Sequence, residues 1–210
     1  MTRTMSFSCL VLCALSCILV MVGCMENDDT TILPDNVRLR PGDMVLRMGN
    51  GLASHAVLMA DGGGTYSHIG IAVDSAGTLM IVHAVPGEPD YPGDEDRVKM
   101  ESPQRFYAAV NAVTGRILRF PDSVTARRAA QAAMGVYRRH TLFDHDYDAS
   151  DTTQMYCCEL VEFAYCKAGH PLVGKGIHQV NLPGLKIRDV IFPSDFIRSP
   201  ELATVAAFGK

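Results

Sequence analysis

The stretch HIGIAVDSAGTLMIVHAV, residues 68–85, decides the fold. Residues 68–73 and 78–85 are rich in β-branched and other apolar side chains, as strands are. Between them lies Asp74-Ser75-Ala76-Gly77, a sequence typical of the turn that joins two antiparallel strands. The stretch therefore predicts a β-hairpin. Counting back from this turn places His68 and His83 nearly opposite each other on one face, with both imidazoles directed toward the helix that follows later in the chain.

The sequence around the hairpin predicts a mixture of strands and helices. Apolar periodicity and turn residues indicate two strands, 44–48 and 115–120, and four helices, 51–59, 102–110, 123–139 and 157–168. Residues 86–93 contain three prolines and two glycines and predict a surface loop. The acidic stretch 144–148 favours an exposed polar loop over a metal site. We therefore expect an α+β fold in which an antiparallel sheet or partial barrel packs against helices.

The N-terminus has the features of a secretory signal. Arg3 precedes the apolar run 9–22, which is too short to span a bilayer comfortably and ends just before Cys24. This pattern resembles the lipobox of bacterial lipoproteins; a plain signal peptide or an uncleaved anchor is the alternative. The prediction is a signal peptide over 1–23, a lipid on Cys24, a tether over 24–38 and one domain over 39–210. The protein is then a lipid-anchored lipoprotein of the bacterial cell envelope.

Charge and cysteine content narrow the classes of function. Removing residues 1–23 would take away Arg3 as the only charged residue, so the net charge moves from −4 to −5 and gives no reason to expect nucleic-acid binding. Of the seven cysteines, only Cys157, Cys158 and Cys166 follow the lipidation site. Three cysteines on one short segment do not form a disulfide framework. An unpaired thiol in an oxidising compartment indicates a chemical role.

Cys157 is the strongest candidate for a reactive residue. It begins the predicted helix 157–168, where unpaired backbone N–H groups and the helix dipole favour a thiolate and offer hydrogen bonds to an oxyanion. A cysteine nucleophile needs a base, and that base needs a partner to hold its ring. His68 and His83, on neighbouring strands, supply such a pair. Together the three residues predict a nucleophilic site, although each alone is more often structural.

Three segments in this order resemble a known family: Pro41-Gly42-Asp43, Tyr66-Ser67-His68-Ile69-Gly70-Ile71 and Tyr156-Cys157-Cys158-Glu159-Leu160-Val161. The sequence is similar to the YiiX-type permuted papain-like amidases of the NlpC superfamily, which are related to lecithin:retinol acyltransferase-like proteins. The resemblance spans about residues 40–205 and includes Phe192-Pro193-Ser194. It implies a circularly permuted papain-like fold in which the histidine strand precedes the cysteine helix.

The resemblance also implies roles for individual residues. Cys157, rather than Cys158, corresponds to the nucleophile, and His68 corresponds to its base. The third position departs from the pattern, because His83 stands where YiiX-like members often carry glutamate. A neutral imidazole can orient His68 by a hydrogen bond but stabilises charge less than a carboxylate does.

The expected activity is that of a cysteine amidase or peptidase that needs no cofactor and forms an acyl-thioester on Cys157. The substrate is either a cell-wall peptide or an N-acyl or ester lipid, which an anchored enzyme would meet at its own membrane. Two alternatives stay open. One is zinc binding by Cys157, His68 and His83; the other is a surface-binding lipoprotein without catalytic activity. The sequence indicates neither an oligomeric state nor a physiological role.

Overall fold

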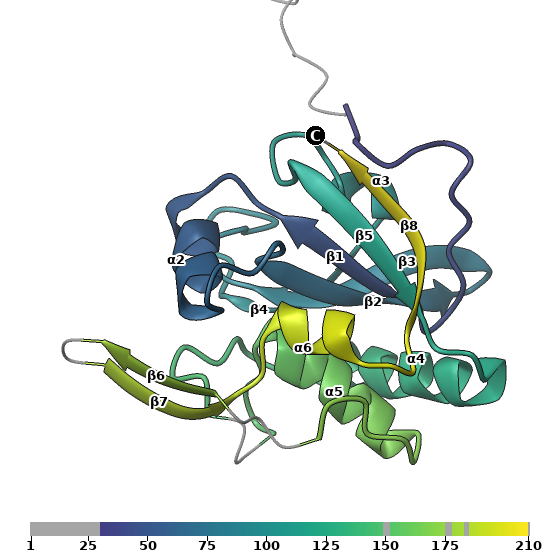
Figure 1. Ribbon diagram of the computed structural model, residues 1–210. Coiled ribbons are helices and arrows are strands. Elements are labelled where there is room, and N and C mark those ends of the chain that lie inside the picture. The colour runs from purple at the N-terminus through teal and green to yellow at the C-terminus, as the bar shows by residue number, and fades with distance from the viewer. Residues whose placement is uncertain (1–29, 149–151, 175–177, 183–184, 210) are drawn as a thin grey trace, which may run out of the picture.

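The computed structural model describes residues 30–148, 152–174, 178–182 and 185–209 (Figure 1). The predicted signal peptide 1–23 and the predicted lipidation site Cys24 lie outside these residues. Within the part of the chain that is described, no helix is both long and apolar enough to cross a membrane. The predicted tether is described from residue 30 onward, and there it packs on the domain: Ile32 N donates to Tyr107 O at 2.9 Å.

The centre of the molecule is a six-stranded sheet with the order β4-β3-β2-β1-β5-β8, in which every neighbouring pair is antiparallel. Its strands are β1 (Met44–Met48), β2 (His68–Ser75), β3 (Thr78–Val85), β4 (Arg97–Glu101), β5 (Thr114–Arg119) and β8 (Ala203–Gly209). A separate pair is formed by β6 (His178–Leu182) and β7 (Leu185–Val190). The predicted α+β class with an antiparallel sheet is therefore confirmed.

The predicted hairpin is β2 and β3, joined by a two-residue turn. Ala76 and Gly77 have φ angles of 53° and 84°, and Gly77 N donates to Asp74 Oδ1 at 2.7 Å. This turn pairs Ser75 with Thr78, so the residue opposite His83 is Gly70. His68 therefore lies two residues along β2 from the position opposite His83, one residue more than predicted, because the turn is centred between residues 76 and 77. The two histidines are diagonal neighbours on the same face.

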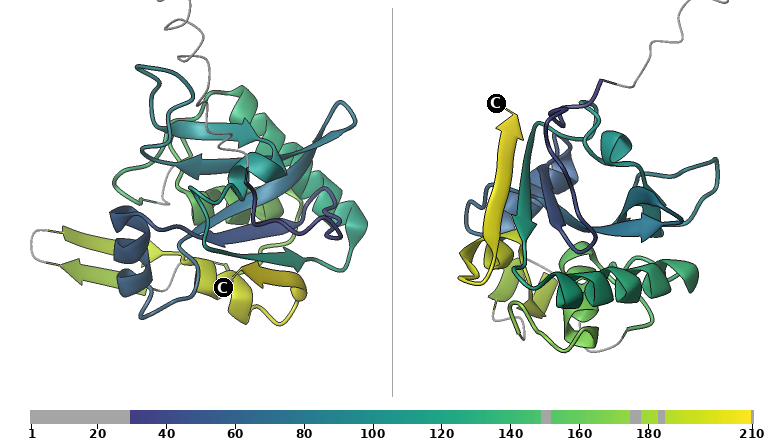
Figure 2. Two further views of the ribbon diagram at one scale, coloured as in Figure 1. Left: turned by 90° about the horizontal axis from the view of Figure 1, so that it is seen from above. Right: turned by 90° about the vertical axis from the view of Figure 1, so that its right-hand side faces the viewer.

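Two helices cover one face of the sheet, α4 (Ser123–Arg138) and α5 (Cys157–Lys167) (Figures 1 and 2). Helix α4 begins where predicted, because the Asp122 carboxylate accepts hydrogen bonds from Val124 N and Thr125 N. Small residues on α4 let it approach the sheet closely. The core on this side of the sheet includes Leu46, Ile69, Ile71, Val82, Ala129, Ala133, Leu160 and Val161.

Among the described residues, three short helices remain: α2 (Leu52–Ala60), α3 (Pro103–Phe106) and α6 (Pro193–Arg198). Helix α3 is shorter than the predicted 102–110. It begins at Ser102, whose hydroxyl accepts from Arg105 N, and ends at Tyr107. Its residues belong to a second core on the other face of the sheet, which includes Val45, Ala72, Ile81, Phe106, Tyr107 and Ile117.

Candidate active site

Cys157 is the first residue of α5. Tyr156 is the N-cap in extended conformation, and the first helical hydrogen bond runs from Leu160 N to Tyr156 O at 3.0 Å. The N–H groups of Cys157 and Cys158 therefore lie in the first turn, where a helix supplies no acceptor of its own. Cys157 is partly exposed, whereas Cys158 is buried. A ligand can therefore reach Cys157 at the positive end of the helix dipole.

The residue before Cys157 fixes this end of the helix. Tyr156 is buried, and its hydroxyl oxygen accepts a hydrogen bond from Ile191 N at 3.0 Å. Burial raises the pKa of Tyr156, so the phenol stays protonated. On its other side, its ring contacts that of Tyr147 with the ring centroids 5.4 Å apart. Tyr156 thus ties the start of α5 to the segment between β7 and α6.

His68, at the start of β2, lies beside Cys157, and each of the two side chains shifts the pKa of the other. Burial lowers the pKa of His68 to about 4, although the contact with Cys157 acts in the opposite direction. The ring is therefore neutral at pH 7 and is able to accept a proton.

The thiol of Cys157 is made more acidic by its surroundings. Its pKa lies well below the ordinary value because Cys158, His68 and a backbone hydrogen bond at Ile69 stabilise the thiolate, and these effects outweigh burial. The two sulfur atoms of Cys157 and Cys158 are 3.9 Å apart. Burial raises the pKa of Cys158 well above its usual range, so Cys158 keeps its proton and can donate to the neighbouring sulfur. Cys157 therefore gives up its proton more readily than an ordinary cysteine does.

His83 is fully buried behind His68. Its Nδ1 atom lies 2.9 Å from His68 Nε2, and the two ring centroids are 5.1 Å apart at an interplanar angle of 73°. Burial first, and then the positive charges of Arg47 and Lys99, lower the pKa of His83 well below its usual value. His83 is therefore a neutral hydrogen-bonding partner of His68 at pH 7.

Phe106 of α3 closes the other side of the two histidines. Its ring centroid lies 5.7 Å from that of His68 and 5.2 Å from that of His83. The expectation that both imidazoles point toward the cysteine helix therefore holds for His68, which lies beside Cys157, and was wrong for His83, which lies behind His68. Both belong to the sheet face that carries Phe106, and His68 meets Cys157 because it starts β2 where α5 begins.

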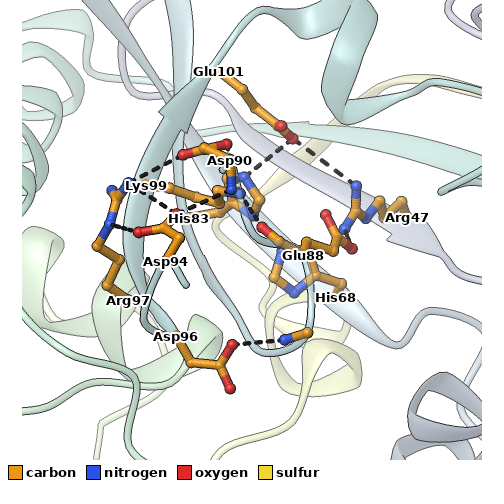
Figure 3. A network of polar contacts seen from close by, with 11 residues as sticks. Arg47, His68, His83, Glu88, Asp90, Asp94, Asp96, Arg97, Lys99 and Glu101 are labelled. Atoms are coloured by element: carbon orange, nitrogen blue, oxygen red, sulfur yellow. Dashed lines mark hydrogen bonds and ion pairs between the residues drawn. The ribbon is translucent and has the colours of Figure 1, made fainter. Parts of the chain in front are cut away.

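Glu101, at the end of β4, lies against His83 and was not predicted from the sequence. Its Oε1 atom lies 3.1 Å from His83 Nε2, although the two groups are not aligned as in an ideal hydrogen bond (Figure 3). Arg47 Nη1 lies 4.0 Å from the same oxygen. The sequence signal for β4 is the alternation of Val98 and Met100 with polar residues. This alternation was not read as a strand because it spans only five residues, three of which are charged.

Arg47 is a buried cation beside these groups. It lies on β1, forms an ion pair with Glu88, and donates from Nη1 to Phe106 O at 2.8 Å. Its guanidinium carbon lies 4.7 Å from the centroid of the Phe106 ring. Arg47 therefore has several partners that hold its charge next to Glu101.

The predicted loop 86–93 is held by ion pairs with β4 (Figure 3). Lys99 Nζ lies 2.9 Å from Asp90 Oδ1, and Arg97 Nη2 lies 3.1 Å from Asp90 Oδ2. These contacts explain how a strand with two cations, one of them buried, is stable at the edge of the sheet.

Among the described residues, no group of three or more histidine, cysteine, aspartate or glutamate side chains is arranged to hold a metal ion. The acidic stretch 144–148 is organised around Asp144, whose buried carboxylate accepts from Asp146 N at 2.8 Å and from Asp148 N at 2.5 Å. Tyr147 of this stretch has a φ angle of 56°, and its pKa is raised by burial first and then by the charge of Cys157. The segment therefore lies beside the cysteine.

Comparisons with known proteins identify the fold. No protein-family model matches the sequence. No curated protein matches it either. Among solved structures, the fold is similar to that of a protein described as metalloprotein yiiX from Escherichia coli O157:H7, with a TM-score of 0.65 and 17% sequence identity over 83% of this chain and 100% of that chain. The predicted resemblance to YiiX is therefore confirmed at the level of the fold.

Proposed function

We propose that this protein is a cysteine hydrolase in which Cys157 is the nucleophile, His68 its base and His83 the residue that orients His68. The observation that carries the proposal is the position of Cys157, at the start of α5, beside His68, together with the lowered pKa of the thiol. A thiolate is the nucleophilic form of cysteine, and an adjacent imidazole is its usual proton acceptor. The YiiX-like fold is consistent with this assignment, and we interpret it as a permuted papain-like fold.

In the first step, His68 accepts the Cys157 proton while the sulfur attacks the carbonyl carbon of the substrate. The oxygen of the resulting tetrahedral intermediate becomes negative, and the first-turn N–H groups of α5 are placed to bind it. The imidazolium of His68 then donates its proton to the leaving nitrogen or oxygen, and the carbon–heteroatom bond breaks. An acyl-thioester on Cys157 and the free amine or alcohol result.

In the second step, water hydrolyses the thioester. His68 takes a proton from the water as the oxygen attacks, and then returns that proton to the departing sulfur. The products are a carboxylic acid and the original cysteine. His83, hydrogen bonded to His68 Nε2, holds the ring in one orientation through both steps.

The substrate class follows from the predicted location. If Cys24 carries a lipid, the enzyme is held at a membrane of the cell envelope, where it meets cell-wall peptides and acylated lipids. We propose an amide or acyl ester of one of these two classes as the substrate. Lipidation of Cys24 is tested by metabolic labelling with a fatty-acid analogue, which the wild type incorporates and a Cys24→Ser variant does not.

The activity is tested with the full chain in detergent, incubated with peptidoglycan digests and separately with lipid extracts. Cys157→Ala is expected to abolish product formation. Cys166→Ala, which changes the exposed cysteine of the same helix, is expected to retain it. Product that forms equally with Cys157→Ala would overturn the proposal, and the fraction in which product appears identifies the substrate class.

A zinc site was the first alternative, and the description of yiiX as a metalloprotein raises it again. The residues of this chain do not fit such a site. His68 Nε2 and His83 Nδ1 lie 2.9 Å apart and bond to each other, whereas two zinc–nitrogen bonds of about 2.0–2.1 Å at a tetrahedral angle hold their nitrogens farther apart. Stoichiometric zinc in the purified protein, lost in Cys157→Ala, would favour this alternative.

The second alternative is a surface binder without catalytic activity. It predicts that Cys157 reacts with iodoacetamide below pH 7 no faster than Cys166 does. The proposed enzyme predicts the opposite, because burial and Glu162 raise the pKa of Cys166 to about 11 while the pKa of Cys157 is lowered.

A further inference from the structure

A continuous chain of polar groups runs inward from the proposed nucleophile. It begins at Cys157 and passes through His68 and His83 to Glu101, and each group comes from a different helix or strand. Because His68 Nε2 faces His83 Nδ1, the other nitrogen of His68, Nδ1, is the one left for Cys157. His83 likewise uses its second nitrogen, Nε2, toward Glu101 (Figure 3).

Glu101, at the inner end of this row of polar groups, influences which nitrogen of each imidazole carries the proton. A neutral imidazole has one nitrogen that donates and one that accepts, so fixing one nitrogen fixes the other. An ionised Glu101 only accepts, so its Oε1 atom, 3.1 Å from His83 Nε2, favours the tautomer of His83 that carries its proton on Nε2. His83 Nδ1 is then an acceptor, and His68 must place its own proton on Nε2 to donate to it. This leaves His68 Nδ1 without a proton and facing Cys157.

We propose that Glu101 is a positioning residue that sets the tautomers of His83 and His68, so that His68 Nδ1 is free to take the Cys157 proton. This inference rests on the proposed function, because it concerns the base of the same reaction. Glu101 does not touch the substrate in this proposal. It acts through the rings of His83 and His68. It thereby supplies a carboxylate to a site in which His83 occupies the position where YiiX-like proteins often carry glutamate.

Burial has the largest effect on Glu101 and raises the pKa of its carboxyl above the ordinary value. The positive charges of Arg47, which is itself buried, and of Lys99 and Arg105 act in the opposite direction and stabilise the carboxylate. Phe106 separates Arg47 from solvent on one side, so the charge of Arg47 is weakly screened at Glu101.

Replacing Glu101 by a residue without a carboxylate removes the preference for the His83 tautomer that carries its proton on Nε2. With Glu101→Leu no group accepts from His83 Nε2, and His83 is free to carry its proton on Nδ1. His68 Nε2 must then accept, and its own proton moves to Nδ1, where it blocks transfer from Cys157. Glu101→Gln has the same shape as the wild-type side chain, but its amide either accepts or donates, so both tautomers of His83 become populated.

The test reads the tautomers directly, by two-bond ¹H–¹⁵N correlation spectra of the full chain labelled with ¹⁵N-histidine at pH 7. The wild type is expected to show His68 and His83 both protonated at Nε2. Glu101→Gln and Glu101→Leu are expected to show protonation at Nδ1 as well. Glu88→Gln is the matched control, since it removes the other carboxylate on Arg47 but leaves Glu101 in place, and it is expected to keep the wild-type tautomers.

A second readout is the rate of Cys157 alkylation at pH 7. It is expected to fall roughly tenfold to a hundredfold in the two Glu101 variants, the range typical when a carboxylate that orients a functional histidine is removed. Exclusive Nε2 protonation in both folded variants, or Nδ1 protonation of His83 in the wild type, would overturn the inference. Failure of the proposed function has a different signature: wild-type Cys157 would alkylate no faster than Cys166, whatever the tautomers. The isosteric Glu101→Gln keeps the test valid if Glu101→Leu does not fold.

Discussion

Gly70 lies directly across the β2–β3 ladder from His83. A Cβ atom at residue 70 would lie 3.1 Å from His83 Cβ and 2.8 Å from Ile81 Cγ2. Both distances are shorter than normal contacts in a packed core. The missing side chain therefore leaves the space in which the His83 ring lies beside its diagonal neighbour, His68.

Gly70→Ala is expected to destabilise the fold by about 1–3 kcal/mol, because the added methyl group must displace Ile81 or His83. It is also expected to weaken the contact between the two histidines and slow the alkylation of Cys157. Urea unfolding and iodoacetamide labelling measure the two effects. Gly135→Ala is the control: residue 135 lies in α4 with open space around it, and alanine there should stabilise the protein by about 0.5–1 kcal/mol. Equal stability of the two variants would contradict the steric argument.

The sequence predicted the hairpin, α4 and α5 because their signals are local. Period-two alternation, a turn at Ala76-Gly77 and the Asp122 cap each act over a few residues. The family motifs pointed to Cys157 and His68, and these two residues are in contact. The exact register between β2 and β3 was not predicted, because it depends on where the turn is centred and the composition of the turn does not determine this.

The sequence did not predict β4, and with it Glu101 was missed. The five residues RVKME contain three charges and read as a surface segment. They are half buried because Arg97 and Lys99 find acidic partners in the preceding loop, which is a tertiary effect. Strand β8 was missed as well, since it is largely exposed and is specified by pairing with β5 rather than by its own apolar pattern.

Cys158 tunes the neighbouring nucleophile. Because the hydrogen bond from Cys158 is the largest effect that lowers the pKa of Cys157, Cys158→Ala is expected to raise that pKa. The pH profile of Cys157 alkylation, followed by mass spectrometry, should shift to higher pH while the rate at high pH stays the same. Cys166→Ala, at the other end of α5, should leave the profile unchanged. A profile that does not move in Cys158→Ala would show that the Cys158 thiol does not donate to Cys157.

The buried histidines make the fold sensitive to acid. Burial lowers the pKa of His68 from 6.5 to about 4, so between these values the unfolded chain binds a proton that the folded protein does not. The contribution of His68 to the free energy of unfolding, about 3 kcal/mol, is therefore fully present above pH 6.5 and is lost as the pH falls toward 4. The pKa of His83 is lowered too and acts in the same direction, whereas the raised pKa of Glu101 opposes it.

The measurement is the free energy of unfolding in urea at pH 7 and pH 4. His68→Asn is expected to lose less stability over this interval than the wild type does. The control is His140→Asn, because His140 is exposed and has a φ angle of 54°, which asparagine tolerates. If His68→Asn and the wild type lose the same stability, the acid sensitivity comes from other groups.

Two buried tyrosines of the same region allow an effect on the stability of the fold to be distinguished from an effect on the reactivity of Cys157. Tyr156 Oη accepts from Ile191 N at 3.0 Å next to Cys157, whereas Tyr165 Oη donates to Gly42 O at 2.7 Å near the opposite end of the same helix. Each phenylalanine variant leaves one buried backbone group without its partner, which costs about 1–3 kcal/mol. Tyr156→Phe should also release the start of α5 and change the alkylation rate of Cys157. Tyr165→Phe should lose similar stability and leave the alkylation rate of Cys157 unaltered. An equal change of this rate in both variants would mean that it depends on the stability of the whole fold and not on the position of the start of α5.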